Sequence, residues 1–351
     1  MTAVATPPPA RRSLHQRLRP VSHVGMDLGT ANTIVAIRGE GVVLDEPTVA
    51  ALDANGTITC VGLEAKRMLG RTPDHLRALR PMKDGVIADF LVAEQMIRQF
   101  LTMALSRGIF RVRPTVVIAV PSCITEVERR AVRDAAESAG VTKLRMVPEP
   151  LAAAIGAGLP VDAPTGSMIV DLGGGTTDVA IMALSGIVCD TSIRVGGDEL
   201  DTAIVHYMRK HHNLLIGETT AEMLKIRLGS VITHQGEATV PVKGRDLVSG
   251  LPRTTMVEAA AIRDAIREPL ESVVNAVRRA LEQVPPELGS DLIEYGLTLT
   301  GGGAKLRGLD QLLQMETGLP VHVAPEPLRV VAHGVERILE DLDRYESILT
   351  P

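Results

Sequence analysis

The chain has 351 residues, a length that accommodates about two domains at roughly 100–200 residues each. Hydrophobic residues make up 45% and aromatic residues only 2%, so we expect a large core built from aliphatic side chains. The net charge of −5 and the scarcity of aromatic rings argue against a nucleic-acid partner.

The cysteine pattern and the hydropathy place further bounds on the protein. Its three cysteines are scattered and never form a C-x-x-C pair, which argues against a disulfide framework or a cysteine zinc site. No apolar run approaches the ~18–20 residues that cross a bilayer. No apolar segment follows the N-terminal arginines, so we expect no secretory signal. The sequence therefore predicts a soluble cytoplasmic protein.

The first part of the chain predicts a tail followed by strands and helices. Residues 1–20 combine a proline run with four arginines, a composition typical of a mobile tail. Apolar runs, capping patterns and prolines then locate the elements. Strands are predicted at 21–28, 33–37 and 115–120, and helices from Asp89 to about 107, from Thr125 to Gly140, and from Pro150 onward.

The second part predicts two more strands, a helical region and a closing strand and helices. In residues 198–284, apolar residues recur at spacings of three and four, which predicts that this region is mostly helical. The expected helices lie near 199–212, 219–228, 257–267, 270–284, 306–316 and 333–344, and the expected strands at 167–170, 177–184 and 297–300.

One pattern occurs twice. A strand, an Asp-Leu-Gly turn and a second strand occur around Asp27 and again around Asp171, about one domain length apart. The simplest account is two similar α/β halves that face each other, each with a glycine hairpin at a shared cleft.

The repeated turns have the chemistry of a phosphate site. A glycine turn between strands exposes successive backbone N–H groups, which hold phosphate oxygens. Thr30 and Asn32 follow the first turn, and Thr176 and Thr177 follow the second, so hydroxyl and amide groups lie beside the phosphates. The alternative, that each turn is only a tight hairpin, is weakened because the pattern is duplicated.

Each turn is preceded by an aspartate at a strand end, Asp27 or Asp171. Carboxylates beside phosphates call for a cation, and magnesium usually keeps several waters between itself and the protein. We therefore expect both aspartates to bind Mg²⁺ through water, and the nucleotide to be ATP.

A third glycine turn, Gly301–Ala304, joins a predicted strand to a helix and lets a flat adenine ring lie against the backbone. The chain has no G-x-G-x-x-G fingerprint and no Walker A lysine after a glycine run. A Rossmann fold and a P-loop are therefore excluded.

The motifs resemble those of a known superfamily. Segments 25–30 (GMDLGT), 171–178 (DLGGGTTD) and 299–303 (LTGGG) are similar to the two phosphate motifs and the adenosine motif of the actin-like ATPases. Segments 27–33 (DLGTANT), 80–90 (RPMKDGVIADF) and 149–160 (EPLAAAIGAGLP) resemble the bacterial actin family MreB. The resemblance covers about residues 21–345.

The resemblance implies an α/β, actin-like ATPase fold: two similar halves around a nucleotide cleft, each a mixed sheet with helices, plus two smaller inserted subdomains. The first half would be 21–160, with an insertion at about 48–80 and completion by 333–351. The second would be 161–332, with a helical insertion at about 198–290.

The resemblance also implies roles for individual residues. Glu149 would position the water that attacks the γ-phosphate, and Thr176 would contact that water; the alternative for Glu149 is an acid that stabilises a helix N-terminus. Glu222 and Lys225 would contact ribose and adenine; the alternative is a surface ion pair. The remaining implied nucleotide contacts are Thr30, Ala31, Asn32, Gly174, Gly175, Gly302, Gly303, Ala304 and Lys305.

A loop at 108–113 places Ile109 and Phe110 among arginines. Such a tip can enter an anionic membrane face, which the resemblance favours; the alternative is that both side chains fold back onto the core. The N-terminal segment is a poor amphipathic helix, so it leaves open whether the loop or the tail is the anchor.

The resulting prediction is an ATP-binding bacterial actin that forms filaments with slow ATP hydrolysis, peripheral on the inner face of the cell membrane. It would work with cell-wall synthesis and morphogenesis membrane proteins to determine rod shape. The alternatives are a division or segregation actin, or, less favoured, a small-molecule kinase on the same fold. A DnaK-type chaperone is disfavoured because we find no further peptide-binding domain.

Overall fold

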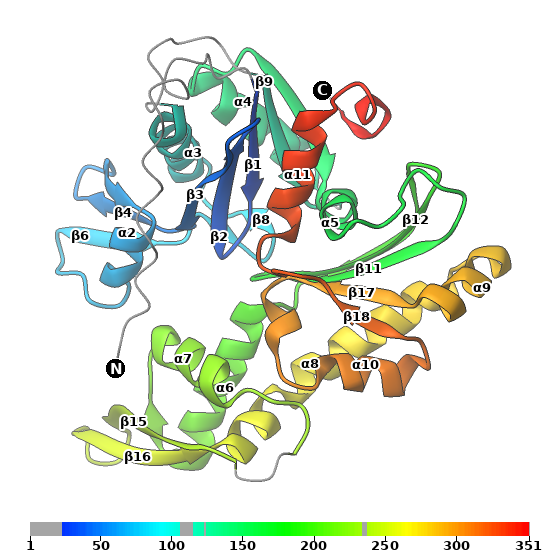
Figure 1. Ribbon diagram of the computed structural model, residues 1–351. Coiled ribbons are helices and arrows are strands. Elements are labelled where there is room, and N and C mark those ends of the chain that lie inside the picture. Colours follow the sequence, from blue (N-terminus) through cyan, green and yellow to red (C-terminus); the bar gives the residue numbers. More distant parts are fainter. Residues whose placement is uncertain (1–22, 106–114, 123, 234–236, 351) are drawn as a thin grey trace.

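The computed structural model describes residues 23–105, 115–122, 124–233 and 237–350, and Figure 1 shows two lobes, each built around a five-stranded sheet. The predicted mobile tail at 1–20 and the predicted membrane tip, Ile109 and Phe110, lie outside the described residues. Expectations that concern those segments therefore stay predictions.

The first sheet has the strand order β10-β9-β1-β2-β3. Strands β1, β9 and β10 run parallel to one another. Strand β2 pairs antiparallel with β1, and β3 pairs antiparallel with β2. The bounds are β1 His23–Leu28, β2 Asn32–Ile37, β3 Gly41–Pro47, β9 Thr115–Val120 and β10 Lys143–Pro148.

The second sheet has the order β13-β12-β11-β17-β18 and repeats the same directions. Strands β11, β17 and β18 are parallel. Strand β12 pairs antiparallel with β11, and β13 pairs antiparallel with β12. The bounds are β11 Ser167–Leu172, β12 Thr177–Ala183, β13 Gly186–Ile193, β17 Leu297–Thr300 and β18 Val321–Val323. The predicted duplication is therefore confirmed, because order and direction match strand for strand.

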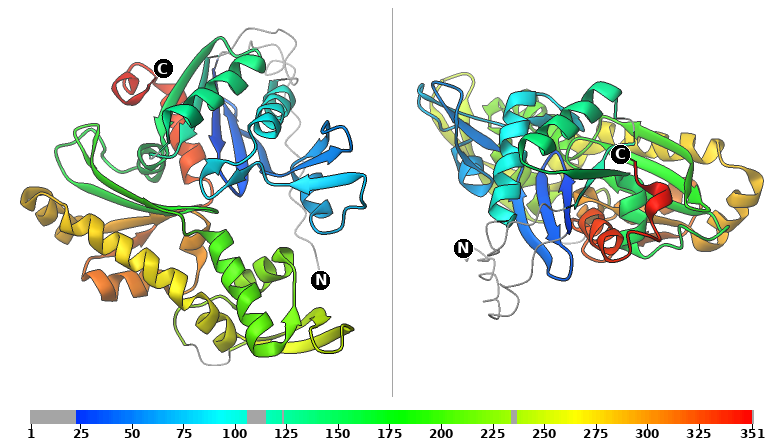
Figure 2. Two further views of the ribbon diagram at one scale, coloured as in Figure 1. Left: turned by 180° about the vertical axis from the view of Figure 1, so that it is seen from behind. Right: turned by 90° about the horizontal axis from the view of Figure 1, so that it is seen from above.

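Two helices lie between the sheets, α5 (Glu149–Ala157) and α11 (Val330–Glu340), as Figures 1 and 2 show. Their buried faces share one core with one face of each sheet. Strand β9 shows how period-two alternation divides the cores: Val117 and Ala119 face α5 and α11, whereas Val116 and Ile118 face the opposite side.

The outer faces of the sheets are covered by the remaining helices. Helices α3 (Phe90–Leu105) and α4 (Glu126–Ser138) cover the first sheet. The second sheet is covered by α6 (Gly197–His212), α8 (Ala259–Glu282), α9 (Pro286–Tyr295) and α10 (Leu309–Thr317). The predicted capping box is confirmed, since Thr125 and Glu128 bond reciprocally at the start of α4.

Two smaller sheets extend the lobes. The first contains β4 (Ala50–Asp53), β5 (Ile58–Val61) and β6 (Leu76–Leu79), with helix α2 (Leu63–Met68) beside it. The second contains β14 (Leu214–Leu215), β15 (Thr239–Asp246) and β16 (Pro252–Glu258), near α7 (Glu218–Leu228). A two-stranded hairpin, β7 (Met82–Lys83) with β8 (Val86–Ile87), connects the first small sheet to α3.

The structure corrects the prediction for residues 198–284 in two places. Residues 239–258 form the antiparallel pair β15 and β16, not part of a helical region. Helix α8 is one helix through Pro269, not two helices that meet near it. Proline removes one backbone hydrogen bond, but the buried stripe of Ile266, Leu270 and Val273 continues across it, which stabilises the unbroken helix.

Candidate functional site

The two repeated glycine turns face each other across the cleft between the lobes. The turn after β1 carries Thr30 and Ala31, and the turn after β11 carries Gly174 and Gly175. A Cβ added to Gly174 would lie 2.7 Å from the Cβ of Ala31, and one added to Gly175 would lie 2.9 Å from the backbone of Asp84. Gly174 is therefore required for the two turns to approach this closely, and Gly175 is required for the second turn to approach the β7–β8 hairpin.

The carbonyl groups of the turns are engaged by neighbouring donors. The hydroxyl of Thr48 donates to the carbonyl of Gly29 at 2.7 Å, and the Thr48 N–H donates to that of Ala31 at 3.0 Å. In the second turn, the N–H groups of Gly197 and Asp198 donate to the carbonyls of Gly173 and Gly174 at 3.0 and 2.8 Å. Holding the carbonyls in this way fixes the turns and favours exposure of N–H groups to an anion.

One pocket contains most of the predicted phosphate and metal residues. Both aspartates, Glu149 and the two turns contribute to its wall. The predicted site residues that line it are Asp27, Thr30, Ala31, Asn32, Glu149, Asp171, Gly174, Thr176 and Gly302.

Three carboxyl groups from the two lobes, those of Asp27, Glu149 and Asp171, line this pocket, and the buried Asp178 lies close enough to add its charge. Desolvation and the nearby charge of Asp171 raise the pKa of Asp27 to about 7, and desolvation and the charge of Asp178 raise that of Asp171 to about 7. Desolvation, together with the charges of Asp178, Asp27 and Asp171, raises the pKa of Glu149 well above its ordinary value. The cluster therefore carries unbalanced negative charge when ionised, which a cation would neutralise.

The donor set fits a hydrated Mg²⁺ ion better than a directly coordinated metal. Within the described part of the chain, no three His, Cys, Asp or Glu side chains are close enough to hold a metal ion between them. Carboxylates that are separated in this way can still accept hydrogen bonds from the waters that Mg²⁺ retains.

The third glycine turn lies at the end of β17, where η1 (Gly302–Lys305) begins. Gly301 has φ +79°, and Gly302 lines the pocket with Leu328. Gly303 packs so closely on the side chain of Leu172 that a Cβ would clash with it. The side chain of Ala304 is buried in the core, and Lys305 is exposed, so neither side chain lines the pocket.

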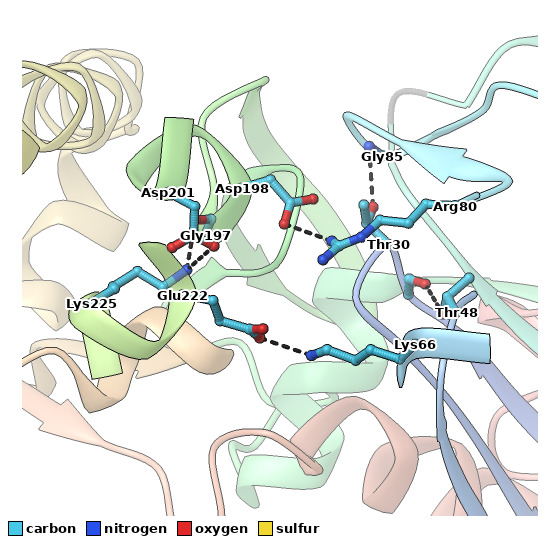
Figure 3. A network of polar contacts seen from close by, with 11 residues as sticks. Thr30, Thr48, Lys66, Arg80, Gly85, Gly197, Asp198, Asp201, Glu222 and Lys225 are labelled. Atoms are coloured by element: carbon cyan, nitrogen blue, oxygen red, sulfur yellow. Dashed lines mark hydrogen bonds and ion pairs between the residues drawn. The ribbon is translucent and has the colours of Figure 1, made fainter. Parts of the chain in front are cut away.

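Glu222 and Lys225 lie on α7, outside the residues that line the pocket. Glu222 accepts from the Nζ of Lys66 on α2 at 3.0 Å, across the cleft (Figure 3). Lys225 donates to Asp201 at 2.8 Å and to the carbonyl of Gly197 at 2.7 Å. The ion-pair alternative predicted that Glu222 and Lys225 pair with each other. In the structure each residue pairs with a different partner instead.

Comparison with known proteins identifies the family. A family model described as MreB/Mbl protein matches residues 21–347. The chain belongs to the MreB/Mbl family. It is 49% identical over 327 residues to the cell shape-determining protein MreB of Escherichia coli strain K12, covering 92% of this chain and 94% of that protein. It is 45% identical over 322 residues to the cell shape-determining protein Mbl of Bacillus subtilis strain 168, covering 92% and 96%.

Solved structures agree with this assignment. MreB5 of Spiroplasma citri bound to ADP matches with a TM-score of 0.87 and 33% identity, over 93% of this chain and 98% of that one. The same protein bound to AMPPNP matches with a TM-score of 0.86 and 34% identity, with the same coverage. A MamK double helical filament matches with a TM-score of 0.76 at 21% identity, over 91% and 98%, which supports the actin-like fold alone.

Sequence reasoning missed Asp178 as a site residue, although it ends the quoted motif at 171–178. Asp178 lies on β12 directly opposite Asp171 in the strand register, and it is buried. Its hydrogen bond with Thr176 measures 2.8 Å. The signal was a second acid on the far side of the glycine turn, which the hairpin register places opposite the first.

None of the helices in the described ranges is both long and apolar enough to cross a bilayer.

Proposed function

We propose that this chain is a filament-forming MreB-family actin that binds ATP with Mg²⁺ and hydrolyses it slowly. The filaments would assemble on the inner face of the cell membrane and organise cell-wall synthesis to maintain a rod shape. The observation that carries the proposal is the pair of equivalent glycine turns, one from each duplicated sheet, facing each other in a pocket lined by three carboxyl groups. Cell shape is the role named for the MreB and Mbl relatives.

The two turns would hold the phosphates from both lobes. Backbone N–H groups and the hydroxyls of Thr30 and Thr176 supply the donors, together with Asn32. The close approach of Gly174 to Ala31 brings the turns within reach of one phosphate chain, with Gly175 beside them in the second turn. A ligand that contacts both lobes binds the closed state more tightly than the open state, so its binding favours closure of the lobes.

Asp27 and Asp171 would hold Mg²⁺ through water, and the ion would offset the charge of phosphates and carboxylates alike. Support comes from the raised pKa values of both acids, which show that each carboxylate lies in a site that disfavours uncompensated charge. MreB5 of Spiroplasma citri, at 33–34% identity, was solved with ADP and with AMPPNP.

Glu149 would act as the base that positions the attacking water, with Thr176 contacting the same water. Both side chains line the pocket that contains the turns, as these roles require. Burial holds the pKa of Glu149 high, so its carboxylate accepts a proton more readily than an exposed glutamate does.

The nucleoside would lie beside Gly302, with the backbones of Gly303, Ala304 and Lys305 forming the rest of the adenine cradle. Glu222 and Lys225 would contact the ribose and adenine from α7. We divide the chain into 21–160 with 333–351 as one half and 161–332 as the other, with insertions at about 48–80 and 198–290.

Self-assembly would use a head-to-tail contact, which generates an open filament when its rotation does not close a ring. The membrane partner would be an anionic inner surface, contacted by Ile109 and Phe110. Cell-wall synthesis and morphogenesis membrane proteins would bind the assembled filament.

Sedimentation tests the proposal directly. Full-length protein is centrifuged with ATP and Mg²⁺, with ADP, and without nucleotide, each with and without anionic liposomes. We expect ATP and Mg²⁺ to move the protein into the pellet and liposomes to increase that fraction. Protein that stays monomeric at micromolar concentration under every condition would overturn the filament assignment.

A further inference from the structure

Thr176 is held on two faces by residues that have no assigned role. Its hydroxyl donates to Oδ2 of Asp178 at 2.8 Å. On the other side, a Cβ added to Gly85 would lie 2.5 Å from the Thr176 methyl carbon, so the glycine backbone covers the methyl group. The side chain is therefore confined to one orientation, with its hydroxyl directed to Asp178.

We propose that Asp178 and Gly85 are positioning residues that fix the Thr176 hydroxyl as the acceptor for the water attacking the γ-phosphate. This inference rests on the proposed ATP hydrolysis and adds to it the reason why Thr176 orients water correctly. Neither positioning residue needs to touch the nucleotide.

A hydroxyl group has only one hydrogen to donate. Threonine has one O–H donor and two acceptor lone pairs. Because its hydrogen is given to Asp178, Thr176 can only accept a hydrogen bond from the water. The water then donates one hydrogen to Thr176 and the other to Glu149, and its lone-pair side faces the phosphorus.

The resulting step balances. The water oxygen bonds to the γ-phosphorus while the bond from that phosphorus to the bridging oxygen breaks, and its electron pair leaves on ADP. One water proton goes to Glu149 and the other stays on the phosphate. A Thr176 hydroxyl that donated to the water instead would withdraw electron density from the attacking oxygen and leave one water hydrogen without its acceptor, and would slow the step.

The strands place Asp178 rigidly for this role. It sits within β12, paired in register with Asp171 on one side and with Ser192 of β13 on the other. Burial raises the pKa of Asp178, and hydrogen bonds from the hydroxyls of Ser192 and Thr176 to the carboxyl group oppose that rise. A buried carboxylate in the middle of a three-strand pairing has little freedom to turn away from Thr176.

Gly85 completes the clamp from the first lobe. It lies in the turn of the β7–β8 hairpin with φ +75°, and its N–H donates to the Thr30 hydroxyl at 3.3 Å. The same residue therefore touches a threonine from each phosphate turn. A side chain at position 85 would displace Thr176 and strain the backbone.

The test separates the acceptor role of Asp178 from a structural one. The AMPPNP dissociation constant and single-turnover phosphate release are measured for the full chain and for D178A, D178N, T176V and the D178A/T176V double variant. For D178A we expect phosphate release to fall about 10–100-fold with AMPPNP affinity within about threefold, the pattern of a lost transition-state contact. D178N keeps an acceptor oxygen, so we expect it to stay within about fivefold of the parent.

The double variant and a control sharpen the result. Because Asp178 acts through Thr176, the double variant should be no slower than T176V alone, which is a strongly non-additive pair. D343N removes an exposed carboxylate far along the chain from the site and should match the parent. Thermal unfolding of each variant identifies any that fold poorly, and D178N keeps the shape of the parent side chain.

Several outcomes would overturn the inference. One is that D178A releases phosphate as fast as the parent. Another is that D178N is as slow as D178A. A third is that the double variant is slower than T176V by the full factor that D178A alone loses. In each case the proposed function survives, because the parent chain still binds and hydrolyses ATP. A parent chain that neither binds AMPPNP nor releases phosphate would instead overturn the proposed function itself, and this inference with it.

Discussion

Gly334 of α11 lies directly against the backbone carbonyl of Ala152 on α5, and a Cβ at position 334 would clash with that oxygen. Gly156 makes the reciprocal approach to Val330, so the two central helices meet backbone to backbone. The contact is possible only because each helix contributes a glycine to it, and it lies in the core shared by both sheets.

The first prediction concerns this contact. Gly334→Ala should destabilise the protein by about 2–4 kcal/mol, because the helices must separate within a close-packed core. Urea unfolding measures the change. Gly289→Ala on α9 is the matched control, since its Cβ would meet its nearest neighbour at 3.9 Å, and alanine is the better helix former by roughly 0.5–1 kcal/mol. Equal stabilities for the two variants would contradict the packing argument.

The second prediction concerns the carboxyl cluster. The folded-state pKa of Asp27 and of Asp171 is about 7, above the ordinary value of 3.8. The folded chain therefore keeps protons that the unfolded chain releases between about pH 4 and pH 7. The contribution of these acids to the free energy of unfolding should fall as the pH rises through that window.

Asp171→Asn removes one of these charges. Without nucleotide, we expect the variant to be more stable than the parent at pH 8 by on the order of 2 kcal/mol, and nearly equal to it at pH 4. Urea unfolding at both pH values checks this, with Asp343→Asn at an exposed position as the control. A variant that is less stable than the parent at pH 8 would contradict the expected sign.

The third prediction concerns Lys66 and Glu222, whose ion pair crosses the cleft. If Glu222 contacts ribose, the nucleotide must displace this pair, which is about one-third exposed and worth roughly 0.2–1 kcal/mol. Lys66→Met should therefore tighten ADP binding by up to about fivefold. Calorimetric titration measures the affinity, with Arg67→Met on the exposed side of α2 as the control. A tenfold weaker affinity would show that Lys66 itself binds nucleotide.

Local patterns were sufficient to predict the duplicated turns. The Asp-Leu-Gly segments place a strand end, a turn and a polar side chain within a few residues, so their spacing alone predicts a hairpin with exposed N–H groups. The same local logic located the Thr125 cap and the helix that begins at Glu149. Duplication of the turn then predicted two facing halves, and the sheet orders agree.

Features that depend on distant partners could not be predicted in this way. The partners of Glu222 and Lys225 lie on other elements, so their spacing on α7 did not reveal the pairing with Lys66 and Asp201. Strand β15 contains Pro241 and Gly244, which weaken a strand pattern, and its pairing with β16 is what stabilises it. Helix α8 continues through Pro269 because its buried stripe packs on the second lobe.

The central claim is that the facing turns hold one nucleotide, and Gly174→Val tests it most directly. A Cβ at position 174 would lie 2.7 Å from that of Ala31, so valine should force the turns apart. Calorimetric titration with AMPPNP and Mg²⁺ should show one nucleotide bound per chain for the parent and for Gly289→Ala, and at least tenfold weaker binding for Gly174→Val. Equal affinity in Gly174→Val and the parent would contradict a phosphate site between the turns.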